Sequence, residues 1–353
     1  MLAVRELGRE DYAVRNQLVA DSPQGNVFLH ADWLQMLGDT DPDLRSLILG
    51  CFDDEGRLVG GQAVTYHQRW GMDISATFEF FYSGPMVVPV AGNQAGGVTR
   101  AAAIVSALAE ALAERLAYVE FETHPAFGDV RPFLYAGWQV VPTYTHIWPM
   151  DDVDRAWRVM SQGKRRRIER ARKQFTFGME EGDAVLDEYL PLHHQTVRKF
   201  YWQPSPTWEA IFRRRFHWMR ERDGCRLYTA RTGTGELAGG ELVLLSREDE
   251  TANIWQQAFD REYLAQGISP ALDWYAASDL ATEFPQVNFG SSPYPSLAQF
   301  KVEMGAEPVV HFTVRKNNAR FRWAIYQRAL KLKDRVYNLA MSWKRLLRQR
   351  SRS

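Results

Sequence analysis

The chain has little cysteine and no long apolar segment. Cys51 and Cys225 are its two cysteines in 353 residues, and cysteines this far apart encode neither a zinc ribbon nor a disulfide framework. No stretch approaches the roughly 18 uncharged apolar residues of a membrane-spanning helix. The N-terminus, MLAVRELGREDY, lacks the basic and apolar regions of a secretory leader. We therefore expect a protein of the reducing cytoplasm that does not span the membrane.

Motifs for metal and covalent chemistry are missing as well. The sequence has no HExxH and no GxSxG, and the adjacent His193 and His194 would point to different faces of a helix. The segment TGTGELAGG (232–240) satisfies the dinucleotide fingerprint, but it lies between two predicted strands, whereas that fingerprint needs a strand and then a helix. We expect no metal and no tightly bound cofactor.

The total charge is zero, yet the charges are unevenly distributed. The chain has 43 basic and 43 acidic side chains, but residues 315–353 hold 13 basic residues and one acidic residue. That end is therefore at +12 and residues 1–314 are at −12. Apolar residues alternate with the cations, which predicts a basic amphipathic C-terminal helix at 317–353. It has three interpretations: binding to anionic lipid, binding to RNA phosphates, or docking on the acidic body.

An internal duplication is visible in the order of the segments. The strand-like segments, helices and glycine turns of the first half recur in the second, which favours two copies of one α/β unit. Residues 151–222 read as helical with no counterpart in the first half. We predict a first domain at 1–150 and a second at 151–316 with a helical insertion at 151–222. The aligned pairs are 53–64 with 232–243, 118–123 with 286–291, and 136–142 with 304–310.

Periodicity predicts the individual elements. The first copy has strands at 44–53, 58–68, 72–83, 118–123 and 138–148, a helix at 98–117 and another ending near Gly137. The second copy has strands at 225–232, 236–246, 250–260, 287–290 and 307–315, with helices at 270–284, opened by Pro270, and 296–304.

Two segments are candidates for binding phosphate. Gly267 and Ser269 form a turn before a predicted helix, where free backbone N–H groups and the helix dipole attract anions. An ordinary glycine turn capped by Ser269 is the alternative. The run KRRRIERARK at 164–173 offers Arg165 and Arg166 to phosphates; a solvated helix face is the alternative.

The segment NFGSSPYPSLAQFKVEMG (288–305) carries the candidate catalytic residue. A buried strand ends in a glycine and serine turn, and the following helix places Lys301 near the end of the sheet. A lysine there can bind a phosphate or stabilise a developing oxyanion. A solvated lysine is the alternative.

The order of these motifs resembles the FemAB-like branch of the GNAT acyltransferases, which includes the bacterial peptidoglycan aminoacyltransferases. The resemblance covers about residues 1–316. It implies an α/β fold of tandem GNAT-like domains, with mixed, mostly antiparallel sheets flanked by helices. The motifs that carry it are NVFLHADWLQML (26–37), YSGPMVVP (82–89), YVEF (118–121), RRRIERARK (165–173), ELAGGELVLL (236–245) and VNFGSSPYPSLAQFKVEMGAEPV (287–309).

The resemblance implies acyl transfer to an amine, with acyl-CoA or aminoacyl-tRNA as co-substrate. Lys301 matches a lysine near the family's active site, and the Gly267 turn lies where GNAT folds bind donor phosphates. The sequence departs from the family in lacking a clear Arg/Gln-x-x-Gly-x-Gly/Ala loop, in Asn288, where Asp is frequent, and in lacking a long coiled-coil insertion.

We therefore expect an enzyme that acylates an amine-bearing envelope, peptidoglycan or exopolysaccharide precursor at the inner face of the cell membrane. The alternative is a catalytically silent protein of this fold that binds tRNA, anionic lipid or a protein partner. The expected substrate site lies between the domains and comprises Trp33, Tyr82, Trp255, Asn288, Gly290, Ser291 and Ser292.

Overall fold

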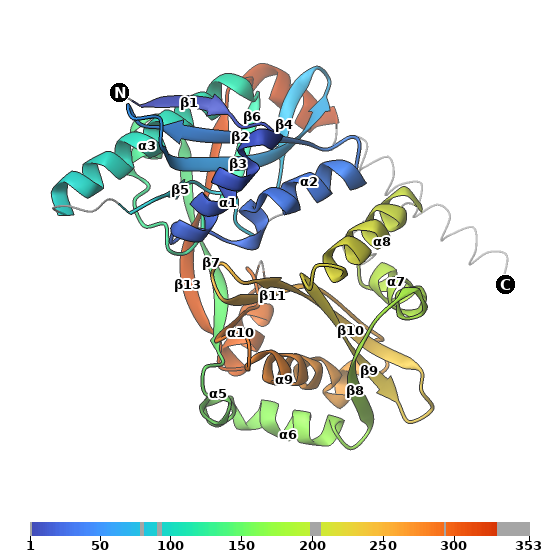
Figure 1. Cartoon of the computed structure of the whole chain (residues 1–353). Coiled ribbons are helices and arrows are strands. Elements are labelled where there is room, and N and C mark those ends of the chain that lie inside the picture. Colours follow the sequence, from blue (N-terminus) through green and yellow to red (C-terminus); the bar gives the residue numbers. More distant parts are fainter. Residues whose placement is uncertain (1, 78–80, 90–93, 198–205, 293, 330–353) are drawn as a thin grey trace.

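The computed structural model describes residues 2–77, 81–89, 94–197, 206–292 and 294–329. They form two lobes joined by two long strands, β7 (Gln139–Pro149) and β13 (Glu307–Asn317), which run side by side through the middle of the molecule (Figure 1).

The upper lobe in Figure 1 is built from the first half of the chain. Helices cover both faces of an antiparallel meander, with α1 and α2 on one side and α3 on the other. Its elements are β1 (Ala3–Glu6), α1 (Tyr12–Asp21), α2 (Ala31–Thr40), β2 (Arg45–Phe52), β3 (Leu58–Arg69), β4 (Met72–Ala76), β5 (Met86–Val87), α3 (Gln94–Arg115), β6 (Tyr118–Glu122) and α4 (Arg131–Tyr135).

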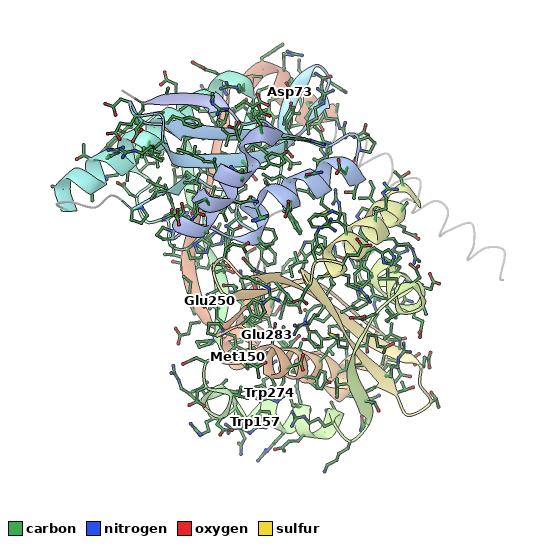
Figure 2. The ribbon with its side chains drawn as sticks, in the orientation of Figure 1. Asp73, Met150, Trp157, Glu250, Trp274 and Glu283 are labelled. Carbon is green, nitrogen blue, oxygen red and sulfur yellow. The ribbon has the colours of Figure 1, made fainter. Side chains whose placement is uncertain are left out.

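The lower lobe repeats this order. Trp157 and Trp274 pack together in its core with ring centroids 4.9 Å apart and ring planes tilted by 56°, and Met150 lies above them (Figure 2). Its elements are α5 (Val153–Val159), α6 (Gln162–Ala171), β8 (Phe175–Glu180), α7 (Asp183–Val197), α8 (Pro206–Arg220), β9 (Cys225–Thr232), β10 (Leu237–Ser246), β11 (Thr251–Phe259), α9 (Ile268–Leu280), β12 (Gln286–Asn288) and α10 (Pro295–Glu303).

The two halves exchange their closing strands. The described strands form one 13-stranded sheet in the order β1-β2-β3-β4-β6-β13-β7-β12-β11-β10-β9-β8, with β5 beside β3. The strand order is the same when it is followed from either end of the sheet, with each strand of one half replaced by its equivalent in the other half. β13 of the second half therefore completes the first lobe, and β7 of the first half completes the second lobe. The predicted boundary near residue 150 stays a prediction, and the sheet crosses it without a break.

The duplication extends to the glycine pairs that the sequence aligned. A Cβ on Gly60 would lie 2.4 Å from Ile104 of α3, and one on Gly61 would lie 2.9 Å from Leu18 of α1. In β10, a Cβ on Gly239 would meet Ile268 of α9 at 3.4 Å, and one on Gly240 would meet Tyr189 of α7 at 2.6 Å. Each pair lets one helix approach each face of its sheet closely.

Three expectations need correction. The 151–222 segment is not all helical, because β8 pairs with β9, and its later part has counterparts in the first half: β8, α7 and α8 repeat β1, α1 and α2. Only α5 and α6 are additional.

The strand expected at 72–83 ends at Ala76, and the helix expected at Pro270 begins two residues earlier. Of the predicted C-terminal helix, 320–329 is helical, while 330–353 lies outside the described residues.

Helix α3 is long and apolar enough to cross a bilayer by length and composition, over Ala95–Arg115. One such helix is weak evidence for a membrane span. In this structure Ile104, Leu108 and Leu112 of α3 are fully buried in a core with Leu49, and α3 contacts β2 and β3. It therefore serves the first lobe as a core helix.

The glycine pairs generate a stability prediction. Gly60→Ala should lower the free energy of unfolding by about 1–3 kcal/mol in urea denaturation, because the new methyl group overlaps Ile104. Gly233→Ala is the matched control, since a Cβ there meets nothing within 4 Å. Adding Ile104→Ala to Gly60→Ala should cost less than the sum of the two changes; strict additivity would refute the close approach.

Candidate active site

Two strands end facing each other near the middle of the molecule. β6 reaches β13 with Glu122 opposite Thr313, and β12 ends along β7 with Asn288 opposite Ile147. β12 pairs with β11 at only three positions, while β11 continues to Phe259 without another strand on that edge of the described sheet. Backbone groups of β11 on that edge therefore have no partner strand among the described residues.

A buried polar network closes the junction around Asn288, which is fully buried. Its Oδ1 accepts hydrogen bonds from Thr145 Oγ1 at 2.5 Å and from the Gly290 N–H at 2.8 Å. Its Nδ2 donates to Tyr82 Oη at 3.0 Å and to Asn253 Oδ1 at 3.1 Å. Every hydrogen-bonding site expected of an amide side chain in this position is used, so Asn288 ties β7, β11 and the Tyr82 segment together.

The Tyr82 segment brings the first half into this network. The Ser83 N–H donates to the carbonyl of Glu122 at 3.0 Å, and a Cβ on Gly84 would lie 2.9 Å from the Thr123 Cα. Burial raises the pKa of Tyr82, so its hydroxyl stays protonated. The segment is thus held against the end of β6 while Tyr82 reaches across to the second half.

Lys301 holds the turn that follows β12. Its Nζ donates to the carbonyl oxygens of Phe289, Gly290 and Ser291 at 2.7, 2.9 and 3.0 Å, and the side chain is buried. Burial lowers its pKa to about 8, opposed by the nearby Asp273. All three ammonium hydrogens are used, so in this structure Lys301 is a positioning residue. Lys301 therefore has no ammonium hydrogen left for the predicted direct contact with a reacting group.

Titratable side chains that the sequence analysis did not single out surround this junction. Burial, with a smaller contribution from Glu120, raises the pKa of Glu122 to about 7. Its side chain is still 36% exposed, so it is crowded yet reachable. His311 Nδ1 lies 3.6 Å from Glu122 Oε2, and burial lowers the pKa of His311 to about 4, so this contact joins a neutral ring to the carboxyl. His124 Nε2 lies 3.3 Å from Asp249 Oδ2.

The predicted aromatic residues lie beside the network in one continuous layer. The ring centroids of Trp33 and Trp255 are 6.3 Å apart, and the ring planes meet at 72° in an edge-to-face contact. Phe28 is 5.2 Å from Trp33 and 5.5 Å from Phe81, which in turn is 6.4 Å from Tyr82. The layer packs α2 of the first lobe against β11 of the second.

The predicted substrate residues therefore divide into two groups. Trp33, Tyr82 and Asn288 are at most 3% exposed in this structure, and their contact with substrate stays a prediction. Ser291 is exposed at the turn, and Gly290 adopts a left-handed conformation, with φ of 70°, that favours glycine. The buried Ser292 hydroxyl has no hydrogen-bond partner among the described residues.

The predicted phosphate site at the start of α9 is partly covered. Gly267 has φ of 85°, and a Cβ on it would lie 2.9 Å from the backbone oxygen of Arg167, because α6 packs against this turn. Arg165 donates to two carbonyl oxygens at the end of α5, at 2.7 and 3.2 Å. Arg166 is exposed, and Ser269 is half-buried in the first turn of α9. Arg165 is thus occupied, whereas Arg166 and Ser269 stay candidates.

A buried carboxyl pair lies on the α9 side of the second sheet. Gln257 Nε2 donates to Glu241 Oε2 at 2.8 Å and to Asp273 Oδ1 at 2.5 Å. Burial raises the pKa of Asp273 to about 6 and that of Glu241 well above its ordinary value. Because two charges cannot be buried together cheaply, the pair holds at least one proton at neutral pH.

Within the described ranges, no group of three or more His, Cys, Asp and Glu side chains is arranged to hold a metal ion.

Each lobe consists of an antiparallel meander, a helix, a strand parallel to the last meander strand, a second helix and a closing strand, which is the GNAT acyltransferase fold in tandem. Residues 151–301 match the Acetyltransferase (GNAT) domain family. The predicted fold class and its FemAB-like resemblance are confirmed.

Solved structures share the whole architecture. FemX superposes with a TM-score of 0.65 at 10% identity, over 91% of this chain and 99% of FemX. A tandem GNAT protein from the clavulanic acid biosynthesis pathway gives 0.56 at 15% identity, over 90% and 99%. The C-terminal domain of a putative lysylphosphatidylglycerol synthetase from Agrobacterium fabrum gives 0.54 at 14%, over 91% and 96%. No curated protein sequence matches significantly. At these identities the likeness establishes the fold.

Lys301→Met tests the positioning role. The variant should lose about 2–4 kcal/mol of unfolding free energy, because three buried carbonyl groups lose their partner. Chemical denaturation measures this, and Lys173→Met, at an exposed position, should be neutral. Unchanged stability together with abolished catalysis would instead restore the direct catalytic role that the sequence suggested.

The carboxyl pair predicts a pH-dependent stability. A carboxyl whose pKa is raised by folding binds its proton more tightly in the folded state, so stability falls as pH rises from about 4 through the folded pKa. Asp273→Asn should therefore be more stable than the parent at pH 8, by about 2 kcal/mol, and equal to it near pH 4. The exposed Asp154→Asn should differ little at either pH; an Asp273→Asn variant less stable at pH 8 would contradict this account.

Proposed function

We propose that the chain is a GNAT-type N-acyltransferase that transfers an acyl or aminoacyl group to an amine of a cell-envelope, peptidoglycan or exopolysaccharide precursor. The observation that carries the proposal is Glu122, a reachable carboxyl with a pKa of about 7 at the junction of the halves. A base for an ammonium substrate needs a pKa near the working pH.

The reaction needs a neutral amine beside an activated carbonyl. Glu122 takes a proton from the acceptor ammonium, and the amine nitrogen then bonds to the acyl carbon. The C–S bond of a thioester or the C–O bond of an aminoacyl ester breaks, and the leaving sulfur or oxygen takes up a proton as the amide forms. The neutral His311 lies 3.6 Å from Glu122, so it borders the carboxyl without adding a charge.

The unpaired edge of β11 supplies the other half of the chemistry. A tetrahedral intermediate carries negative charge on oxygen, and fixed backbone N–H groups stabilise it without reorganisation. The edge beyond Asn253 lies next to the Asn288 network, and Lys301 holds the turn that borders it. A rigid surround of this kind fixes the distance between amine and carbonyl.

The donor is an acyl-CoA or an aminoacyl-tRNA, and both carry phosphates. The first turn of α9, with Gly267, Ser269 and the exposed Arg166, is the proposed phosphate contact. The acceptor class is supported by the structural neighbours: FemX belongs with the peptidoglycan aminoacyltransferases of the FemAB-like branch, and another neighbour is the C-terminal domain of a putative lysylphosphatidylglycerol synthetase. A cytoplasmic enzyme at the inner membrane face, held there by its basic end, fits such acceptors.

Mass spectrometry of reaction mixtures tests the proposal. Acetyl-CoA or charged tRNA is offered with amine-bearing glycan and lipid precursors, and a mass gain of the acceptor equal to the acyl group supports it. A second candidate, a catalytically silent binding protein, is favoured by the burial of Trp33, Tyr82 and Asn288. Binding of an acceptor without any mass gain, with either donor, would favour that candidate.

The base assignment makes a kinetic prediction. For the productive pair, kcat/KM should rise with pH and level off above about 7, as Glu122 loses its proton. Glu122→Gln should lower kcat by roughly 100-fold or more and remove this inflection.

Glu120→Gln is the matched control on the same strand and face. It should retain activity and move the inflection to lower pH, because Glu120 contributes to the raised pKa of Glu122. An unchanged pH profile in Glu122→Gln would remove Glu122 from the mechanism.

A further inference from the structure

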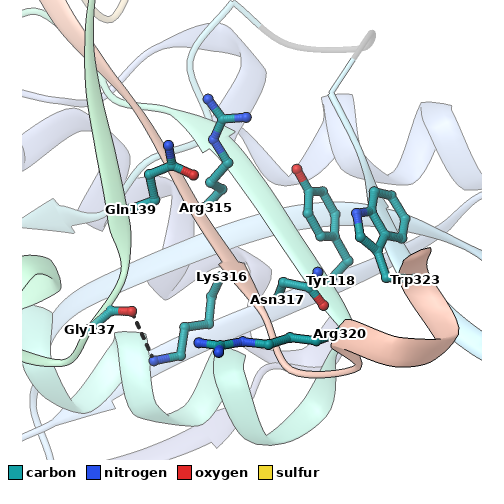
Figure 3. Close-up of a pocket in the computed structure, with 8 residues that line it drawn as sticks. All are labelled: Tyr118, Gly137, Gln139, Arg315, Lys316, Asn317, Arg320 and Trp323. Atoms are coloured by element: carbon teal, nitrogen blue, oxygen red, sulfur yellow. Dashed lines mark hydrogen bonds between the residues drawn. The ribbon is translucent and has the colours of Figure 1, made fainter. Parts of the chain in front are cut away.

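A cationic cavity lies at the far end of β13, away from the junction site. It encloses about 340 Å³ between β13 and the helical segment 320–329. Figure 3 shows Arg315 and Lys316 leaving β13 in opposite directions, the charged end of Arg320 beside that of Lys316, and the Tyr118 and Trp323 rings next to each other. Those rings stack at 4.0 Å with an interplanar angle of 8°, which fixes the segment against β6.

The positive charge that lines the cavity exceeds the negative charge of the carboxylates beside it. Arg315, Lys316 and Arg320 line it, and the Glu120 carboxylate lies 3.8 Å from Arg315 Nη1. That carboxylate is shared, because it also accepts a hydrogen bond from the Tyr118 hydroxyl. The buried Nε of Arg315 has no hydrogen-bond partner among the described residues. Three cations line the cavity and only Arg315 has a carboxylate near it among the described residues, which leaves a site for an anion.

The start of the helical segment adds to this potential. Asn317 Oδ1 accepts from the Ala319 N–H at 3.1 Å, so the segment begins at the rim of the cavity with its positive dipole end toward it. Residues 315–329 contain five basic residues and no acidic residue. Lys316 donates to the Ala136 carbonyl at 2.7 Å, which holds its ammonium at the wall of the cavity.

Large apolar side chains are exposed next to the cavity. Phe321 is 79% exposed and Ile325, one helical turn later, is 43% exposed. Trp70, at the tip of the β3–β4 hairpin, is 60% exposed and lies 5.7 Å from Tyr326 of the same helical segment. Exposed aromatic and aliphatic side chains beside cations are typical of surfaces that lie in the headgroup region of a bilayer.

We propose that this cavity binds a phosphate group, and that the phosphate belongs to an anionic phospholipid at a membrane surface. Arg320 contacts the phosphate oxygens, Arg315 and Lys316 add positive potential around them, and Phe321 and Ile325 insert beside the phosphate. The site is separate from the acyl-transfer chemistry, so its test does not depend on that reaction.

Vesicle binding by the full chain tests the proposal. Phosphatidylcholine vesicles with and without phosphatidylglycerol are sedimented with the protein, and only the anionic vesicles should bind. The Arg315→Gln/Arg320→Gln double variant should lose about tenfold more affinity than the matched double variant Arg348→Gln/Arg350→Gln, because direct hydrogen bonds to a phosphate add to the charge effect. The difference should persist near 1 M salt, where the Debye length is about 3 Å.

A second experiment, with soluble phosphates, distinguishes a lipid headgroup from a free phosphate as the ligand. Calorimetry with glycerol 3-phosphate and inorganic phosphate should show weak binding that Arg315→Gln/Arg320→Gln abolishes. Soluble binding lost in this variant, with vesicle binding equal to that of the tail variant, would overturn the lipid assignment. Equal loss in both double variants and no soluble binding would overturn the cavity itself. Arg320→Gln alone, at an exposed position, serves where the Arg315 change impairs folding, which thermal melting monitors.

Discussion

The pairing of β7 with β13 is the constraint on which the rest of the structure depends. These two strands match residue for residue over nine pairs, from Ile147 opposite Glu307 to Gln139 opposite Arg315. Each also borders the central strand of the other half, β12 for β7 and β6 for β13. Moving either strand would therefore disturb both lobes and the junction between them. The junction is rigid because its two main strands are interior strands of one sheet.

That rigidity explains why some polar residues of the junction are structural and one, Glu122, is reachable. Tyr82, Thr145, Asn253 and Asn288 are buried and hydrogen-bonded to one another, so they keep the junction in one geometry. A buried polar network of this kind is stable only when its members are satisfied. Glu122 stands at its margin, where burial is incomplete. The same crowding that fixes the network raises the pKa of this one carboxyl toward neutrality.

The sequence predicted the repeated α/β unit and most element positions, because period-two strands and the glycine pairs are local signals. It missed β8, whose six residues, FTFGME, have a weak alternating pattern after a strongly charged helix. It placed Tyr82 and Asn288 together but as substrate contacts, since burial is a property of the tertiary structure. It assigned Lys301 to catalysis because the three carbonyl oxygens that occupy the ammonium come from a turn whose conformation the sequence does not reveal.

Glu122 and His124 could not be grouped with Asp249 and His311 from the sequence, because the three segments that carry these residues meet only in the folded chain. The strand exchange that brings them together has a further meaning for the history of the chain. A single copy of the unit, ending in a closing strand that completes a neighbour, is a subunit of a strand-swapped dimer with two-fold symmetry. Fusion of two such copies gives the order found here, and it frees each half to change independently, so that the first half can keep a carboxyl at Glu122 where the second half has Gly290.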